Sequence, residues 1–129
     1  MRHGKAEDAS RHTGYADRSR RLTPEGIANI QAMMPALRQF DLIPDQIVSS
    51  PFPRAAETAR IIHQGLKVIH SVQYMDVLGA DQSILAFFEN NLASLLESEQ
   101  RLMIVGHEPC LSGLASLLIS GRIDTRIQL

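Results

Sequence analysis

This sequence has a single cysteine, no long apolar run and almost no net charge, and each of these features excludes a class of protein. Cys110 is the only cysteine among 129 residues, so no disulfide can form within the chain and a cytoplasmic location is the default expectation. No segment approaches the roughly 20 apolar residues of a membrane-spanning helix, and the N-terminus lacks the apolar core of a signal peptide. The net charge of −1 supplies no general basic field, so we expect neither nucleic acid nor membrane as a partner.

The length and composition are those of one ordinary domain. A chain of 129 residues with 44% hydrophobic content is large enough to bury a single core. It contains no internal repeat, linker or low-complexity tract, so we expect a single domain over residues 1–129. The leucine and methionine content identifies no interface by itself, and the oligomeric state stays open.

Short β-rich runs alternate with longer segments of helical periodicity, a pattern typical of an α/β domain with a mostly parallel sheet. Thr23 is suited to cap a helix that begins at Pro24, and Pro35 is expected to kink or split that helix. The apolar face of this helix repeats at helical spacing through Ile27, Ile30, Met34 and Leu37. Residues 46–50 are predicted to form a buried strand, followed by a helix over residues 54–64 that Gly65 closes.

The second half of the chain continues the same alternation. A third strand is expected over residues 67–70, and a helix over about residues 81–98. The inward face of that helix is predicted to carry Ile84, Phe88, Leu92, Leu95 and Leu96. A further strand over residues 102–105 precedes a helix that contains residues 111–119. Open α/β sheets bind ligands at the carboxyl ends of their strands, where Gly106 and His107 fall.

Two histidines and two arginines occur in three short motifs suited to one phosphate: RHG at 2–4, SSPFPRA at 49–55 and GHEP at 106–109. Guanidinium groups match phosphate geometry bidentately and stay charged, so Arg2 and Arg54 are suited to hold phosphoryl oxygens. A histidine attacks phosphorus only when neutral, and the two arginines favour a lowered pKa for it. Arg54 is expected in a first helical turn, where backbone N–H groups favour an anion.

Together these motifs resemble the histidine phosphatase (phosphoglycerate mutase-like) superfamily, and within it the small phosphohistidine phosphatases of the SixA type. RLTPEG at 21–26, DQIVSSP at 45–51 and ETA at 57–59 extend the resemblance over nearly the whole chain. It implies a phosphoglycerate mutase-like, three-layer α/β/α sandwich with a mostly parallel central sheet. Compared with that family, the first strand and the C-terminal strand are expected to be incomplete in this chain, or its termini to be unusual.

The resemblance also implies a role for each matched residue. His3 would be the nucleophile that becomes phosphorylated and then releases phosphate to water. Arg2, Arg54 and His107 would clamp the phosphoryl group, with His107 a stronger donor if it is protonated. Three carboxylates are candidates for the acid that protonates the leaving group: Glu108, Asp76 and Asp81. Glu108 resembles in position the acidic residue of the acid phosphatase branch, although its side chain could instead point away or cap the next helix.

The expected function is a phosphatase acting on a phosphomonoester or phosphoramidate through a phosphohistidine intermediate, with phosphohistidine on a protein as the favoured substrate. About ten residues separate His70 from the next helix, which leaves no room for a lid and predicts an open site. A phosphatase for small phosphate esters and a non-catalytic phosphate-recognition module are the alternatives. We expect no cofactor and no metal, because Arg2 beside His3 opposes a divalent cation.

Several further residues have two interpretations. The arginines after the first motif line either the entrance for a phosphorylated substrate or a solvated loop: Arg11, Arg18, Arg20 and Arg21. His12, His63 and His70 are expected to be surface or structural, with His12 the best candidate for a substrate contact. Cys110 is expected at a buried or half-buried helix position and not as a nucleophile.

Overall fold

The computed structural model describes residues 1–11, 15–97, 101–124 and 127. Its centre is a parallel sheet of three strands in the order β2-β1-β3. The strands are β1 (Gln46–Ser49), β2 (Gln73–Tyr74) and β3 (Leu102–Val105). The start of the chain joins the end of β3, because Arg2 forms a parallel bridge with Gly106. This confirms the predicted strands at 46–50 and 102–105 and brings the first motif beside the last.

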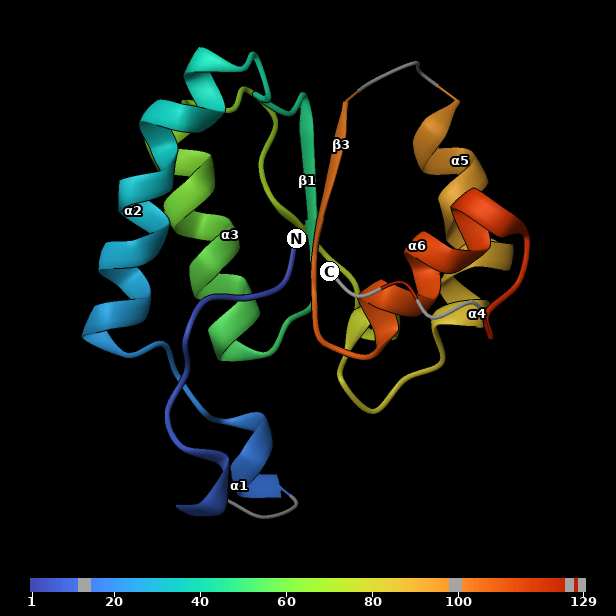
Figure 1. The fold of residues 1–129 in the computed structure, drawn as a ribbon, viewed down its shortest axis with the longest axis horizontal. Coiled ribbons are helices and arrows are strands. Elements are labelled where there is room, and N and C mark those ends of the chain that lie inside the picture. The colour runs from blue at the N-terminus through green and yellow to red at the C-terminus, as the bar shows by residue number, and fades with distance from the viewer. Residues whose placement is uncertain (12–14, 98–100, 125–126, 128–129) are drawn as a thin grey trace.

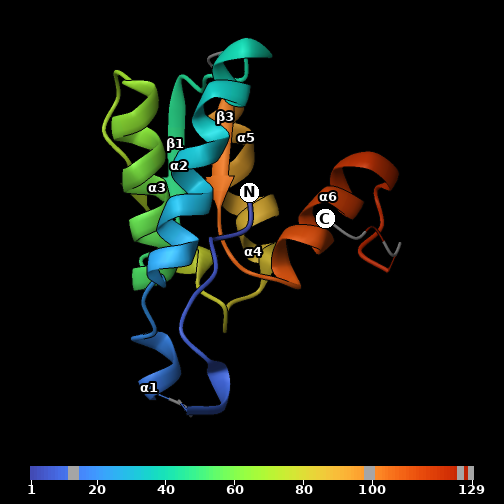
Figure 2. The same ribbon diagram turned by 60° about the vertical axis from the view of Figure 1, so that its left-hand side comes forward.

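Helices cover both faces of the sheet (Figure 1). One layer holds α2 (Pro24–Gln39) and α3 (Pro53–Leu66), which pack against each other and lie side by side in both ribbon views (Figure 2). The other holds α4 (Ile84–Phe87), the π-helical turn η3 (Phe88–Leu92), α5 (Ala93–Leu96) and α6 (Cys110–Ser120). The short elements η1 (Ala9–Arg11), α1 (Tyr15–Arg18) and η2 (Asp76–Leu78) lie in the connections. The three-layer α/β/α sandwich with a parallel sheet is therefore confirmed.

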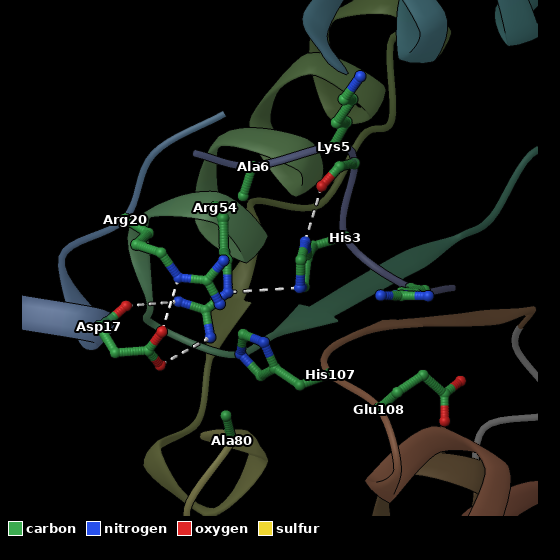
Figure 3. Close-up of a pocket in the computed structure, with 11 residues that line it drawn as sticks. His3, Lys5, Ala6, Asp17, Arg20, Arg54, Ala80, His107 and Glu108 are labelled. Atoms are coloured by element: carbon green, nitrogen blue, oxygen red, sulfur yellow. Dashed lines mark hydrogen bonds and ion pairs between the residues drawn. The ribbon is translucent and has the colours of Figure 1, made fainter. Parts of the chain in front are cut away.

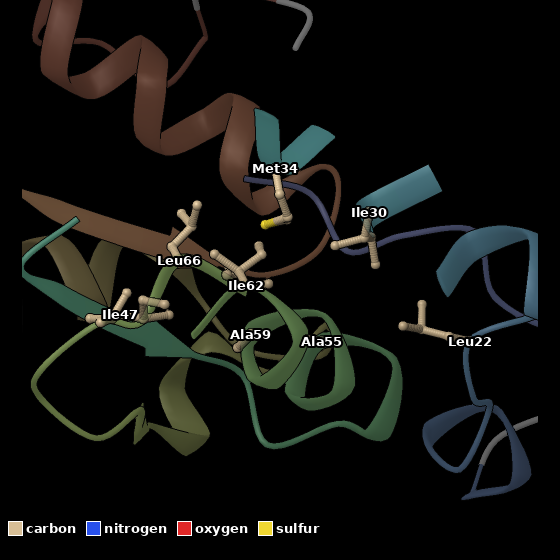
Figure 4. Packing of buried hydrophobic residues seen from close by; sticks show 10 residues of the cluster. Leu22, Ile30, Met34, Ile47, Ala55, Ala59, Ile62 and Leu66 are labelled. Atoms are coloured by element: carbon tan, nitrogen blue, oxygen red, sulfur yellow. The ribbon is translucent and has the colours of Figure 1, made fainter. Parts of the chain in front are cut away.

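Two apolar clusters flank the sheet, and β1 contributes to both. Ile47 packs with Ile30, Met34 and Ile62 under α2 and α3 (Figure 4), whereas Val48 packs toward α4 and α6 on the other face. Alternate burial on both faces is what a central parallel strand requires. In the described part of the chain, no helix has the length and apolar character needed to cross a membrane.

The first long helix, α2, begins as expected but is not interrupted. Thr23 Oγ1 accepts a hydrogen bond from the backbone N–H of Gly26 at 3.0 Å, and Pro24 is the first helical residue. The expected split at Pro35 is wrong, because α2 continues through it to Gln39. A proline inside a helix costs about 3 kcal/mol, and burial of apolar side chains such as Ile30 at about 1.5–3 kcal/mol each offsets that cost.

The end of α3 differs from the prediction. Gly65 lies inside the helix, which ends at Leu66 and is followed by Lys67 in the left-handed conformation with φ 53°. A Cβ on Gly65 would stand 3.1 Å from Met34 Sδ. The glycine therefore serves the close approach of α2 to α3 and does not terminate the helix.

The strand expected over residues 67–70 does not form. Lys67 turns the chain back from α3, and Ile69 is 93% exposed. The second strand is instead Gln73–Tyr74, because the chain must first cross from the end of α3 to the edge of the sheet.

The helix expected over residues 81–98 begins at Ile84 and contains the π-helical turn η3. A π turn holds more residues than an α turn, so it changes which side chains face inward. Ile84 and Leu92 are buried, and Phe88 and Leu95 pack against the same cluster, as predicted. Leu96 is 45% exposed, contrary to the prediction, and Phe87 is buried in addition. The end of the predicted helix, at Ser98, lies outside the described residues.

Candidate active site

The fold brings the three predicted motifs into one pocket of about 610 Å³ (Figure 3). His3 is held beside the end of β3 by the hydrogen bond from its backbone N–H to the carbonyl of Gly106, 3.1 Å. Arg54 is the second residue of α3, and His107 follows β3 by two residues. The pocket is lined by Arg2, His3, Gly4, Lys5, Ala6, Asp17, Arg20, Arg54, Ala80, His107 and Glu108. All five residues predicted for the site are in this set.

Thr58 connects the first motif to the second. Its hydroxyl accepts a hydrogen bond from the backbone N–H of Gly4 at 3.0 Å and donates to the carbonyl of Arg54 at 2.7 Å. A Cβ on Gly4 would come within 2.7 Å of Ile30 Cδ1. Packing against α2 thus favours glycine at this position, in addition to any closeness to a ligand.

Hydrogen bonds to both ring nitrogens define the tautomer of His3. Its Nδ1 lies 2.7 Å from the carbonyl oxygen of Gly4, which can only accept, so Nδ1 carries the proton. Nε2 is then unprotonated and accepts a hydrogen bond from Arg54 Nε at 3.3 Å. The ring presents a lone pair on Nε2 to the pocket.

The pKa of His3 is lowered, in the predicted direction. Burial is the largest cause, and the hydrogen bond to Gly4 opposes it. Three guanidinium groups lower the pKa further: Arg54, Arg2 and Arg20. The predicted effect of the arginines is confirmed, but removal from water outweighs it.

His107 lies deeper than His3 and is only 2% exposed. Its Nε2 is 2.8 Å from the hydroxyl of Ser50, and its ring centroid lies 5.1 Å from that of His3. Burial lowers the pKa of His107 to about 3, with the charges of Arg54 and His3 adding to the effect. The charged, stronger donor considered from the sequence is therefore absent at neutral pH, and His107 is a neutral ring.

Asp17 is a charged pocket residue that the sequence analysis did not identify, and Lys5 is another. Arg54, itself 2% exposed, donates from Nη1 to the carbonyl of Asp17 at 3.0 Å, and its Nη2 lies 3.8 Å from Oδ2 of the same residue. Arg20 Nε forms an ion pair with Asp17 Oδ1 at 2.7 Å. No motif marks Asp17, and the only signal was the arginine-rich run around it.

One arginine of that run, Arg20, lines the pocket. Neither Arg18 nor Arg21 lines it. Arg18 forms an ion pair with Asp81, and Arg21 pairs with Glu57 at 3.3 Å. His12 and the side chain of Arg11 lie outside what the structure describes.

Of the three candidate acids, only Glu108 lines the pocket. Its Oε2 accepts hydrogen bonds from Ser112 Oγ at 2.7 Å and from the backbone N–H of Ser112 at 3.4 Å, so the carboxylate caps α6. In Figure 3, Glu108 lies apart from the group formed by His3, Arg54 and His107. Asp76 and Asp81 are exposed and do not line the pocket.

The remaining histidines and the cysteine lie elsewhere. His63 Nε2 is 3.1 Å from the carbonyl of His70, and neither residue lines the pocket. Cys110 begins α6 at a half-buried position, and burial raises the pKa of its thiol. Among the described residues, no group of three or more His, Cys, Asp or Glu side chains is arranged to hold a metal ion.

A family model and several solved structures resemble this chain. The model of the histidine phosphatase superfamily (branch 1) matches residues 1–78. The protein histidine phosphatase SixA complexed with tungstate is 22% identical, with a TM-score of 0.83 over 100% of this chain and 79% of that one. Among proteins with curated descriptions, none matches significantly.

Two enzymes named for small substrates also share the fold. The α-ribazole phosphatase from Shigella flexneri is 21% identical, with a TM-score of 0.68 over 93% of this chain and 78% of that one. A phosphoserine phosphatase from Entamoeba histolytica, solved with 3-phosphoglyceric acid, is 18% identical, with a TM-score of 0.67 over 99% of this chain and 83% of that one. Such low identities establish the fold and do not choose between these substrates.

Proposed function

This chain belongs to the histidine phosphatase superfamily, and from that premise we propose that it removes a phosphoryl group from histidine on another protein, with His3 as nucleophile. The observation that carries the proposal is the lone pair of His3 Nε2, held beside the guanidinium of Arg54 at 3.3 Å. The burial that lowers the pKa of His3 keeps Nε2 unprotonated at neutral pH, and attack on phosphorus requires Arg54 Nε to release the lone pair.

The reaction divides into two displacements at phosphorus. His3 Nε2 attacks, the bond from phosphorus to the leaving nitrogen breaks, and a phosphohistidine forms on the enzyme. A water then attacks the phosphorus, the bond to Nε2 breaks, and phosphate leaves with the water's oxygen. While phosphorylated, the ring carries a positive charge, which the hydrogen bond from Nδ1–H to Gly4 stabilises; bonds to charged groups contribute about 1.5–3 kcal/mol.

The charges that line the pocket match a phosphoryl dianion. Four cationic side chains and two carboxylates leave two net positive charges: Arg2, Lys5, Arg20 and Arg54 against Asp17 and Glu108. We assign Arg2, Arg54 and His107 to the clamp, because two guanidinium forks and one imidazole can reach different oxygens of one phosphoryl group.

Two features favour a nitrogen-linked phosphoryl group on a protein. Only nine residues separate Tyr74 at the end of β2 from Ile84 at the start of α4, too few for an inserted lid domain. Neither pocket carboxylate is placed as a free acid beside His3. Asp17 pairs with two arginines. Glu108 binds Ser112 through Oε2, its Oε1 is buried without a partner in the described chain, and the side chain lies apart from His3 in Figure 3. A phosphate ester needs an acid for its leaving oxygen, whereas the nitrogen of a phosphoramidate can leave already protonated.

A small phosphate ester is the second candidate substrate, favoured by the shared fold of the α-ribazole and phosphoserine phosphatases. A role of Glu108 as the acid for such an ester stays a prediction. A Glu108→Gln variant tests it, because loss of the acid slows aryl esters with poor leaving groups more than it slows a phosphohistidine protein.

The deciding experiment measures phosphate release from a phosphohistidine protein and from an aryl phosphate. We expect the protein to be the better substrate and His3→Ala to lose turnover of both. His63→Ala is the matched control, because His63 lies outside the pocket. Faster turnover of small esters would select the second candidate, and phosphate binding without turnover would show a recognition module.

A further inference from the structure

Ser50 makes two contacts that together constrain His107. It follows β1 directly and is completely buried, with an exposed fraction of 0%. Its Oγ accepts a hydrogen bond from the backbone N–H of Phe52 at 3.2 Å and lies 2.8 Å from His107 Nε2. A hydroxyl has one hydrogen to donate, so the contact with His107 has only two possible directions.

In the first direction, His107 donates from Nε2–H to Ser50. The hydroxyl hydrogen of Ser50 then has no acceptor among the described residues, although it is fully buried. His107 Nδ1 would carry a lone pair, and that atom is also buried without a partner in the described chain. This first direction therefore leaves two buried polar groups without a partner, the hydroxyl hydrogen of Ser50 and Nδ1 of His107, which is unfavourable.

In the second direction, Ser50 donates its hydroxyl hydrogen to His107 Nε2. The hydroxyl then uses its hydrogen and one lone pair, and the ring proton of His107 is on Nδ1. The single group left without a partner is an N–H donor on a ring that lines the pocket and points toward the space between His3 and Arg54 (Figure 3). A donor there suits a phosphoryl oxygen, whereas a lone pair would repel it.

Because the His107 ring is neutral, the direction of its hydrogen bond with Ser50 determines whether Nδ1 is a donor or an acceptor. Burial holds the pKa of His107 at about 3, so the ring has one proton at neutral pH and cannot donate from both nitrogens. His3 offers a useful contrast, because a carbonyl, that of Gly4, fixes its proton on Nδ1 and turns the lone pair of Nε2 to the pocket.

We propose that Ser50 is a positioning residue that holds the ring proton of His107 on Nδ1, where it serves as a hydrogen-bond donor to the bound phosphoryl group. The inference rests on the proposed function in taking the ligand to be a phosphoryl group. Ser50 acts through the histidine and does not itself contact the ligand.

Nitrogen-15 NMR of the histidine side chains tests the proposal directly at neutral pH. In the wild type, His107 should show a protonated Nδ1 and an unprotonated Nε2. Ser50→Ala should remove that preference and weaken the binding of inorganic phosphate about tenfold, the loss expected for one hydrogen bond to a charged ligand.

Ser49→Ala is the matched control. Ser49 is equally buried and adjacent, but its hydroxyl donates to the carbonyl of Ser50 at 2.9 Å and forms no hydrogen bond with a histidine of the described chain. It should leave the His107 tautomer and phosphate binding unchanged. His3 is the internal reference, since Gly4 holds its tautomer in all three proteins.

A wild-type spectrum with the His107 proton on Nε2 overturns the proposal, and this reading does not require Ser50→Ala to fold. So does a folded Ser50→Ala protein that keeps Nδ1–H and full phosphate affinity. The tautomer is measured without turnover, so failure of the proposed phosphatase activity would be seen separately.

Discussion

The pocket has a core side and a rim side, and the two hold their polar residues differently. On the core side, Arg54 and His107 are each 2% exposed and are connected by hydrogen bonds to His3 and Ser50. On the rim side, α1 contributes Asp17, and the neighbouring ion pair of Arg18 with Asp81 has side chains 53% and 39% exposed.

The difference in burial between the two sides indicates which of them holds the reacting groups in a fixed geometry. A buried polar group must be satisfied, so the core side has one geometry, and a change there leaves an uncompensated neighbour. An exposed ion pair is weakened by water and contributes about 0–1 kcal/mol. We therefore expect the core side to carry the reaction and the rim side to tune binding, and four measurements can break or sharpen that division.

The largest effect is expected at Arg54. Arg54→Ala should lower kcat/KM about 10²–10³-fold, the usual loss when one donor that stabilises transition-state charge is removed. Arg54→Lys should recover only part, because an ammonium cannot bind two oxygens in a fork. Arg60→Ala, an exposed change further along α3, is the control; equal losses in the two alanine variants would contradict a specific role.

The next effect is on stability at low pH. The folded pKa of His107, about 3, lies below the unfolded value of about 6.5, so the unfolded chain binds more protons between these values. The free energy of unfolding should fall as pH drops below about 6.5, by about 1.4 kcal/mol per pH unit for this group. His3, whose pKa is also lowered, adds to the slope.

Urea denaturation at several pH values between 7.5 and 5 checks this slope. His107→Gln should flatten it, whereas His63→Gln leaves His107 in place and should keep it. An unchanged slope in His107→Gln would show that the acid sensitivity lies elsewhere.

A smaller effect is expected from Asp17 on the rim side. Its carboxylate pairs with Arg20 and Arg54 and competes with phosphate for both. Asp17→Asn should tighten the binding of inorganic phosphate about fivefold, since two charges about 4 Å apart interact by about 1 kcal/mol in water. Calorimetric titration measures this, and weaker binding would show that Asp17 orients the arginines instead.

The smallest effect is expected at Asp81. It pairs with Arg18 outside the pocket, so Asp81→Asn should change phosphate affinity and turnover less than about twofold. A change in phosphate affinity as large as that of Asp17→Asn would contradict the expectation that residues outside the pocket contribute little to binding.

Local patterns predicted much of the fold. The cap at Thr23, the strands near Ile47 and Ile104 and the helix that contains residues 111–119 follow from capping chemistry and apolar periodicity, which neighbouring residues determine. The strand expected at 67–70 and the uninterrupted passage through Pro35 could not be predicted in this way. Both depend on where α3 places the chain and on how α2 packs against it.

The site divides along the same line. The sequence by itself determined Arg2, His3, Arg54 and His107 as its members, because the chemistry of phosphate requires those side chains and short motifs carry them. Only the tertiary structure decided that Asp17 joins them, that Glu108 caps α6, and that Ser50 faces His107. The contacts of Asp17 with Arg54 and of Ser50 with His107 join residues far apart in the chain. Burial, which sets the charge of His107, exists only once the layers pack together.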